Sequence, residues 1–189
     1  MDKAIQNFDE SIRVNPEHSF AYENRGACWL TKGDYDKAIQ DFDRVIRLDP
    51  KLPYGYIGRG IAWELKKNRA KSGKDITKGI RILEEFMRAA PSEYSITEQL
   101  AWLYATCANP DFVDGGKSVA FATKACELSR WKLDAAIAVM AAAYARNGNY
   151  DKAVEMLEKA IKMNPKALQK KRARMMKAFK AGKPFVDHQ

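Results

Sequence analysis

The stretch Asp2-Lys3-Ala4-Ile5-Gln6 returns as Asp36-Lys37-Ala38-Ile39-Gln40, an offset of 34 residues. The same offset relates further identical pairs: Phe8 and Phe42, Pro16 and Pro50, Tyr22 and Tyr56, Arg25 and Arg59, Gly26 and Gly60, and Trp29 and Trp63. A fixed period of this size is typical of stacked supersecondary units that share one continuous core. Strands look scarce, because no useful alternating apolar run is present. The sequence therefore predicts a helical repeat protein.

The repeated pattern resembles the tetratricopeptide repeat (TPR), a helix–turn–helix unit of 34 residues. This repeat has a small residue where its two helices cross and a large aromatic residue one turn later. The sequence supplies the small residues as Gly26, Gly60, Ala101 and Ala141, and the aromatic residues as Trp29, Trp63, Tyr104 and Tyr144. The resemblance implies an all-α fold, a right-handed α-solenoid of TPR helix–turn–helix repeats with a C-terminal capping helix.

The second helix of each repeat has a small, then a bulky, then a small packing position. Three repeats fit this pattern with Ala38, Phe42 and Val45; with Ser118, Ala122 and Ala125; and with Ala153, Leu157 and Ala160. The remaining repeat departs from it most, and there we expect Gly79, Leu83 and Phe86 at these positions.

The repeats divide the chain into six segments and predict nine helices. The expected segments are a half repeat with only its second helix (1–18), a TPR (19–52), a TPR with an enlarged basic turn near 66–74 (53–93), a TPR-like unit with a long turn (94–133), a TPR (134–167), and a capping helix with a tail (168–189). Proline after the second helix ends several units, because it cannot extend the helical hydrogen-bond ladder.

The C-terminal half shows a narrower resemblance. The run from Leu100 to Cys107 and the ending Ala181-Gly182-Lys183-Pro184-Phe185 are similar to a large group of bacterial TPR proteins with an AGKP[FY]-type tail. That resemblance implies a bacterial origin and a natural C-terminus, and no single biochemical role is shared in the group. The chain is also readable as a fragment of a longer protein.

Composition favours a folded chain with a core, since 46% of the 189 residues are apolar. No apolar stretch approaches the ~20 residues that span a bilayer, and no signal peptide is visible. We therefore expect a cytoplasmic location for this segment, and export of a longer parent chain stays open.

The residues that usually carry catalysis are scarce. The three cysteines at 28, 107 and 126 form no CxxC pair and fall inside helical apolar patterns, and the two histidines lie at 18 and 188. The chain contains no phosphate-binding loop and no metal-ligand cluster. We expect no enzyme, no metal site and no cofactor.

A partner surface is expected on the first helices of the repeats, which line the concave face of a TPR superhelix. We predict that Asn24, Tyr54, Gln99, Trp102 and Arg146 contact a peptide or partner helix in this groove. For Trp102 a second interpretation stays open, in which its ring packs under the long turn that holds Phe112. The predicted function is a non-catalytic protein–protein interaction scaffold for an unidentified partner.

The net charge of +9 offers an alternative function. Basic residues cluster near the C-terminus without an intervening acid, at Lys170, Lys171, Arg172, Arg174 and Lys177. Such a cluster could bind a polyanion or nucleic acid. A solvated capping helix explains the same residues without any ligand.

The N-terminal half repeat has an apolar stripe of Ala4, Ile5, Phe8 and Ile12. Because its first helix is absent, we expect this stripe to be only partly covered. Three interpretations stay open: the chain is cut from a longer array, it self-associates through this end, or the helix frays.

Overall fold

The computed structural model describes residues 1–187, and within them the chain is all-α with no strand. The ten α-helices are α1 (Asp2–Val14), α2 (Ser19–Lys32), α3 (Tyr35–Leu48), α4 (Pro53–Leu65), α5 (Arg69–Ala89), α6 (Tyr94–Thr106), α7 (Gly115–Leu128), α8 (Asp134–Arg146), α9 (Tyr150–Met163) and α10 (Gln169–Lys180), with a short 3-10 turn at Pro110–Phe112. The predicted count of nine was one short, since the predicted segments themselves contain ten. The last two residues of the predicted segment 168–189 lie outside the described part.

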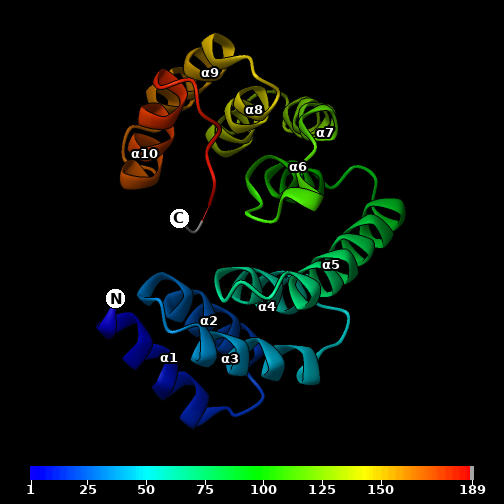
Figure 1. Cartoon of the computed structure of the whole chain (residues 1–189), viewed down its shortest axis with the longest axis vertical. Coiled ribbons are helices and arrows are strands. Elements are labelled where there is room, and N and C mark those ends of the chain that lie inside the picture. Colours follow the sequence, from blue (N-terminus) through cyan, green and yellow to red (C-terminus); the bar gives the residue numbers. More distant parts are fainter. Residues whose placement is uncertain (188–189) are drawn as a thin grey trace. The chain divides into compact units, whose positions relative to one another are not determined.

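The helices form two compact units, Met1–Glu85 and Phe86–Asp187, called unit 1 and unit 2 below. In unit 1, α1 to α4 pack on their neighbours in chain order, and α2 also contacts α4 (Figure 1). In unit 2, α6 to α9 pack in the same way, α10 covers α8 and α9, and the chain then turns back from α10 (Figure 1). Within each unit, consecutive helical hairpins share one core, as expected for an α-solenoid.

Local sequence explains where the second helices begin. The side chains of Asp34, Asn68, Asp114 and Asn149 each accept a hydrogen bond from the backbone N–H three residues later. This is the N-cap contact that satisfies an otherwise unpaired donor of the first turn. The preceding turns need a left-handed residue, which is Gly33 or Gly148 in two of them and Lys67, with φ 60°, in a third.

The structure corrects the enlarged basic turn that was expected near 66–74. Residues 69–74 are the first residues of α5, because Asn68 caps that helix as Asp34 caps α3. The seven extra residues instead lengthen α5, which has 21 residues where α3 has 14. The 34-residue offset therefore continues unbroken from α3 into α5.

This continued register also corrects the packing positions of α5. Ser72 and Ile76, both fully buried, stand where α3 has Ala38 and Phe42, and Gly79 stands where α3 has Val45. A Cβ on Gly79 would meet the side chain of Ile57 on α4 at 2.5 Å, so the two helices cross closely there. Phe86, expected in the core, is 39% exposed.

The small crossing residues confirm the remaining register. A Cβ on Gly26 would lie 3.0 Å from the ring of Phe42, and one on Gly60 would lie 2.8 Å from Ile76. Ala101 and Ala141 hold the same position in unit 2 and are fully buried. No helix among the described residues has the length and apolar character needed to cross a bilayer.

Candidate functional site

The surface of unit 1 formed by its first helices carries two of the predicted groove residues. Tyr54 on α4 and Phe20 on α2 occupy the same repeat position and are exposed, Phe20 at 61% and Tyr54 at 36%. Asn24 is half-buried, and its side-chain amide donates to the carbonyl of Phe20 at 2.8 Å. Burial raises the pKa of Glu23 on the same helix. We call the surface of Phe20, Glu23, Asn24 and Tyr54 the unit 1 face.

The matching surface of unit 2 is occupied by the chain's own C-terminal segment. The indole Nε1–H of Trp102 donates to the carboxylate of Asp187 at 2.9 Å. The guanidinium of Arg146 donates to the carbonyl of Ala105 at 2.5 Å and to that of Phe185 at 3.5 Å. Trp102 is thus half-buried against the returning segment. We call the surface of Gln99, Trp102 and Arg146 the unit 2 face.

The structure therefore brings Trp102 and Arg146 together through a segment that the sequence analysis had not assigned to the site. Phe185 and Asp187 are the site residues that were missed, whereas Lys171 had been predicted only as part of the basic patch. The available signal was an aromatic residue and an acid placed just after the helix stop Gly182-Lys183-Pro184. Gln99 lies on the same helix as Trp102, and its side-chain oxygen is buried with no hydrogen-bond partner among the described residues.

The predicted basic patch is divided among different tasks. Arg172 is 3% exposed and donates to the carbonyls of Ala160 and Asn164 and to the carboxylate of Asp134. Lys171 pairs with Asp187, whereas Lys170 and Lys177 are exposed. The guanidinium of Arg174 lies 5.3 Å from the ring centroid of Phe185. This distribution does not support one continuous surface for phosphates.

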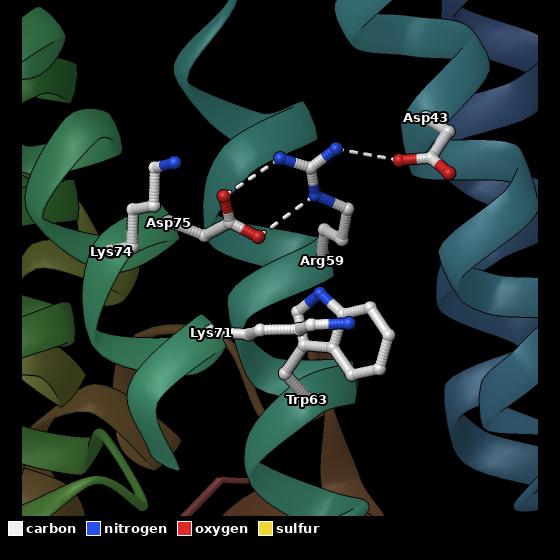
Figure 2. Close-up of a pocket in the computed structure, with 6 residues that line it drawn as sticks. All are labelled: Asp43, Arg59, Trp63, Lys71, Lys74 and Asp75. Carbon is white, nitrogen blue, oxygen red and sulfur yellow. Dashed lines mark hydrogen bonds and ion pairs between the residues drawn. The ribbon is translucent and has the colours of Figure 1, made fainter. Parts of the chain in front are cut away.

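Unit 1 contains a cavity of about 340 Å³ between α3, α4 and α5 (Figure 2). The guanidinium of Arg59 donates two hydrogen bonds to Asp75, at 2.8 and 2.7 Å, and one to Asp43 at 2.6 Å. These bonds, led by those to Asp75, raise the pKa of Arg59 further above its usual range. Arg25 makes the same three bonds, to Asp41 and Asp9, one repeat earlier. Arg59 is thus saturated by carboxylates, as expected of a structural ion pair.

The two lysines of this cavity, Lys71 and Lys74, give no sign of a ligand-binding role. The ammonium of Lys71 lies 4.2 Å from the ring centroid of Trp63, and Lys74 lines the rim (Figure 2). Lysine over the aromatic ring recurs in every repeat, with Lys37, Lys117 and Lys152 over Trp29, Tyr104 and Tyr144. Because all four repeats share it, this contact belongs to the repeat architecture.

The cysteines show no sign of activation. Cys107 and Cys126 are buried, and burial raises the pKa of Cys126 to about 11. A thiol with a raised pKa stays protonated and is a poor nucleophile. In the part of the chain that the structure describes, no group of three histidines, cysteines or acids could hold a metal ion.

The apolar stripe of α1 is partly covered. Ile5 is 5% exposed, and Ala4, Phe8 and Ile12 are half-buried, since α1 packs on α2. Self-association through this stripe stays a prediction.

Comparison with known proteins assigns the repeats. Residues 19–52 and 135–167 match the sequence model of the tetratricopeptide repeat, so both stretches are TPRs. TTC0263, a thermophilic TPR protein of Thermus thermophilus, is similar over 96% of this chain and 89% of its own, with a TM-score of 0.68 and 19% identity. Yeast Tom70 is similar over 94% of this chain and 35% of its own, with a TM-score of 0.54 and 23% identity.

PilF of Pseudomonas aeruginosa is also similar, over 85% of this chain and 67% of its own, with a TM-score of 0.54 and 12% identity. At these identities the likeness shows the fold alone, and it confirms the predicted TPR-type α-solenoid. No curated protein sequence matches the chain. The narrower resemblance to bacterial proteins with an AGKP[FY]-type tail stays a prediction.

Proposed function

We propose that this chain is a non-catalytic scaffold that binds a peptide or a partner helix on the first-helix faces of its repeats. TPR proteins generally mediate protein–protein interactions, and repeats of this family are typically non-catalytic scaffolds. Solenoids of this kind use the surface created by successive repeats for binding. Peptide binding on these faces is the more specific part of the proposal.

The exposure of Phe20 and Tyr54 is the observation that carries this proposal. Large aromatic side chains supply much of the energy at protein interfaces, where they fill pockets of the partner. Here two of them stand at the same repeat position on adjacent first helices, 61% and 36% exposed. Their spacing by one repeat suits an amphipathic helix or an extended segment with two apolar anchors.

Affinity capture from the source cell, followed by titration of the captured partner, tests the function. We expect Phe20→Ala/Tyr54→Ala to weaken binding at least tenfold, because two anchors at ~1–2 kcal/mol each are removed. The control is Val14→Ala, which truncates an apolar side chain that is 72% exposed on α1. Equal binding by both variants, with unchanged helical circular dichroism, would contradict the proposal.

A further inference from the structure

The C-terminal segment returns to the core of unit 2 through two backbone contacts. It leaves α10 at Gly182, whose φ of 64° turns the chain, and Lys183 N–H then caps the carbonyl of Ala178. The N–H of Asp187 donates to the carbonyl of Thr106 at 3.2 Å, and the carbonyl of Phe185 accepts from Arg146. The segment is thus held against α6 and α8.

The first side-chain pocket holds an aromatic ring. Phe185 is 4% exposed and packs within the core cluster of unit 2. Its ring centroid lies 6.0 Å from that of Trp102 at an interplanar angle of 48°, and the Arg174 guanidinium lies 5.3 Å from its ring centroid. Tilted aromatic pairs and a cation over the ring both favour an aromatic side chain over an aliphatic one.

The second pocket holds a carboxylate. One oxygen of Asp187 accepts from the indole N–H of Trp102 at 2.9 Å and from the ammonium of Lys171 at 2.8 Å. The same ammonium lies 4.1 Å from the Trp102 ring centroid, so the indole ring holds the Lys171 ammonium close to its own N–H donor. The carboxylate side chain is 18% exposed, which strengthens its charge-assisted hydrogen bonds.

We propose that the unit 2 face, together with Lys171 and Arg174, is a binding site for an extended segment in which an acidic residue follows an aromatic residue by two positions. The chain's own Phe185-Val186-Asp187 is the resident ligand, and a partner protein carrying the same pattern displaces it. This inference rests on the proposed scaffold function and names the partner chemistry for one of its faces.

The groups of the site belong to helices that are held by other helices as well as by the resident segment. Trp102, Arg146 and Lys171 belong to α6, α8 and α10. Of these, α8 packs on both α6 and α10, while α6 also packs on α7 and α10 on α9. A tethered ligand competes at an effective concentration in the millimolar range for short flexible links. The resident therefore lowers the apparent affinity for a partner, and a weakened resident raises it.

The experiment uses the full chain and a fluorescent Lys-Pro-Phe-Val-Asp peptide with an amidated end. Two matched peptides replace Phe by Ala or Asp by Asn. The protein variants are Asp187→Asn, which loosens the resident, and Asp151→Asn, which neutralises an exposed acid of the same unit as the control. Hydrogen exchange at the Asp187 amide reports whether the resident has left.

We expect Asp187→Asn to bind the peptide about tenfold more tightly than the wild type and Asp151→Asn, because the resident has lost a charge-assisted contact. Both matched peptides should bind Asp187→Asn at least tenfold more weakly than the parent peptide. Adding Lys171→Met to Asp187→Asn should remove this preference for the acidic peptide. Saturating peptide should accelerate exchange at the amide of residue 187.

Three outcomes would overturn the proposal. In the first, the peptide binds neither the wild type nor Asp187→Asn, and the amide of residue 187 stays protected from exchange. The segment would then be a permanent part of the fold. All three peptides bind equally, which removes the stated chemistry. The wild type forms a dimer that the peptide dissolves, which makes a second copy's segment the occupant. The Phe20/Tyr54 capture experiment probes the unit 1 face with another ligand, so its failure is distinguishable from these results.

Discussion

Unit 1 and unit 2 place different chemistry at the same repeat positions. Before the small crossing residue, unit 1 has Arg25 and Arg59, whereas unit 2 has Leu100 and Met140, which are buried. On the second helix, the aspartates that pair with these arginines are replaced by Phe121 and Met156. In unit 2 Phe121 instead stacks on Tyr104, with centroids 5.9 Å apart. The repeat geometry thus requires filled volume at this crossing, and either ion pairs or apolar packing supplies it.

The crossing of adjacent hairpins differs in the same way. In unit 1 a large ring, Phe42, fills the space left by Gly26 and Gly58. In unit 2 the matching second-helix residue is the small Ala122, and the first helices carry the larger Ala101 and Val139. Large and small residues are exchanged across the interface while the combined packing is retained.

The largest expected effect comes from breaking the ion pair of unit 1. Arg59→Met should lower the free energy of unfolding by about 3–5 kcal/mol, because Asp75, which is 6% exposed, is left as an uncompensated buried charge. Urea unfolding followed by circular dichroism measures it.

The double variant Arg59→Met/Asp75→Met copies the Met140 and Met156 arrangement of unit 2. It should recover most of the lost stability, because apolar replacement of a buried pair is often neutral or stabilising. A double variant as unstable as Arg59→Met would show that unit 1 cannot adopt the packing of unit 2.

A smaller effect is expected from the exchanged volumes. A Cβ on Gly58 would lie 2.4 Å from the Phe42 ring, so Gly58→Ala should cost about 1–3 kcal/mol despite the higher helix propensity of alanine. A control in unit 2 is Gly116→Ala, at a glycine near the start of α7 where the nearest atom to an added Cβ is the Asp114 carboxylate oxygen at 3.4 Å. Thermal unfolding should show a lower midpoint only for Gly58→Ala. Equal midpoints for Gly58→Ala and Gly116→Ala would refute the close packing of Phe42 against Gly58.

The smallest expected effect concerns Glu23 and Glu98, which share one repeat position in the two units. Burial raises the pKa of both above the usual 4.5, and Asp134 raises that of Glu98 further. The folded state therefore binds these protons more tightly than the unfolded state, so stability falls as the pH rises from about 4.5 through the raised pKa.

Glu98→Gln should remove its share of this fall and be more stable at pH 7, by less than about 1 kcal/mol. Glu23→Gln should act in the same direction, without the contribution of Asp134. Urea titrations at pH 4 and pH 7 measure the difference, and a variant that loses stability at pH 7 would reverse the assignment.

Much of the fold was predictable, because each repeat carries its own sequence pattern. The crossing residues Gly26 and Ala141 were predicted from the repeated pattern, and the structure confirms them. The caps Asp34 and Asn149 likewise share one repeat position. The error in α5 arose because its seven extra residues were assigned to the turn before it. Asn68 and Lys71 repeat Asp34 and Lys37 at the same offset, so the correct register was present in the sequence.

The candidate site was less predictable. Register placed Trp102 and Arg146 on a first-helix face, but no periodicity indicates what covers that face. Trp102 and Asp187 are 85 residues apart in the chain, and their hydrogen bond depends on how α6, α8 and α10 pack. The partner contacts predicted for Asn24, Tyr54, Gln99, Trp102 and Arg146 all stay predictions.

The sequence by itself determined the helical hairpins and their stacking, because caps, turn residues and the 34-residue period act within one repeat or between neighbours. Only the tertiary structure decided the state of the two faces. The unit 1 face exposes Phe20 and Tyr54, whereas the unit 2 face holds Phe185 and Asp187. The physical reason is that the segment after α10 has no sequence periodicity that would predict its position. It binds where helices distant in the chain bring an aromatic ring, an indole N–H and an ammonium together.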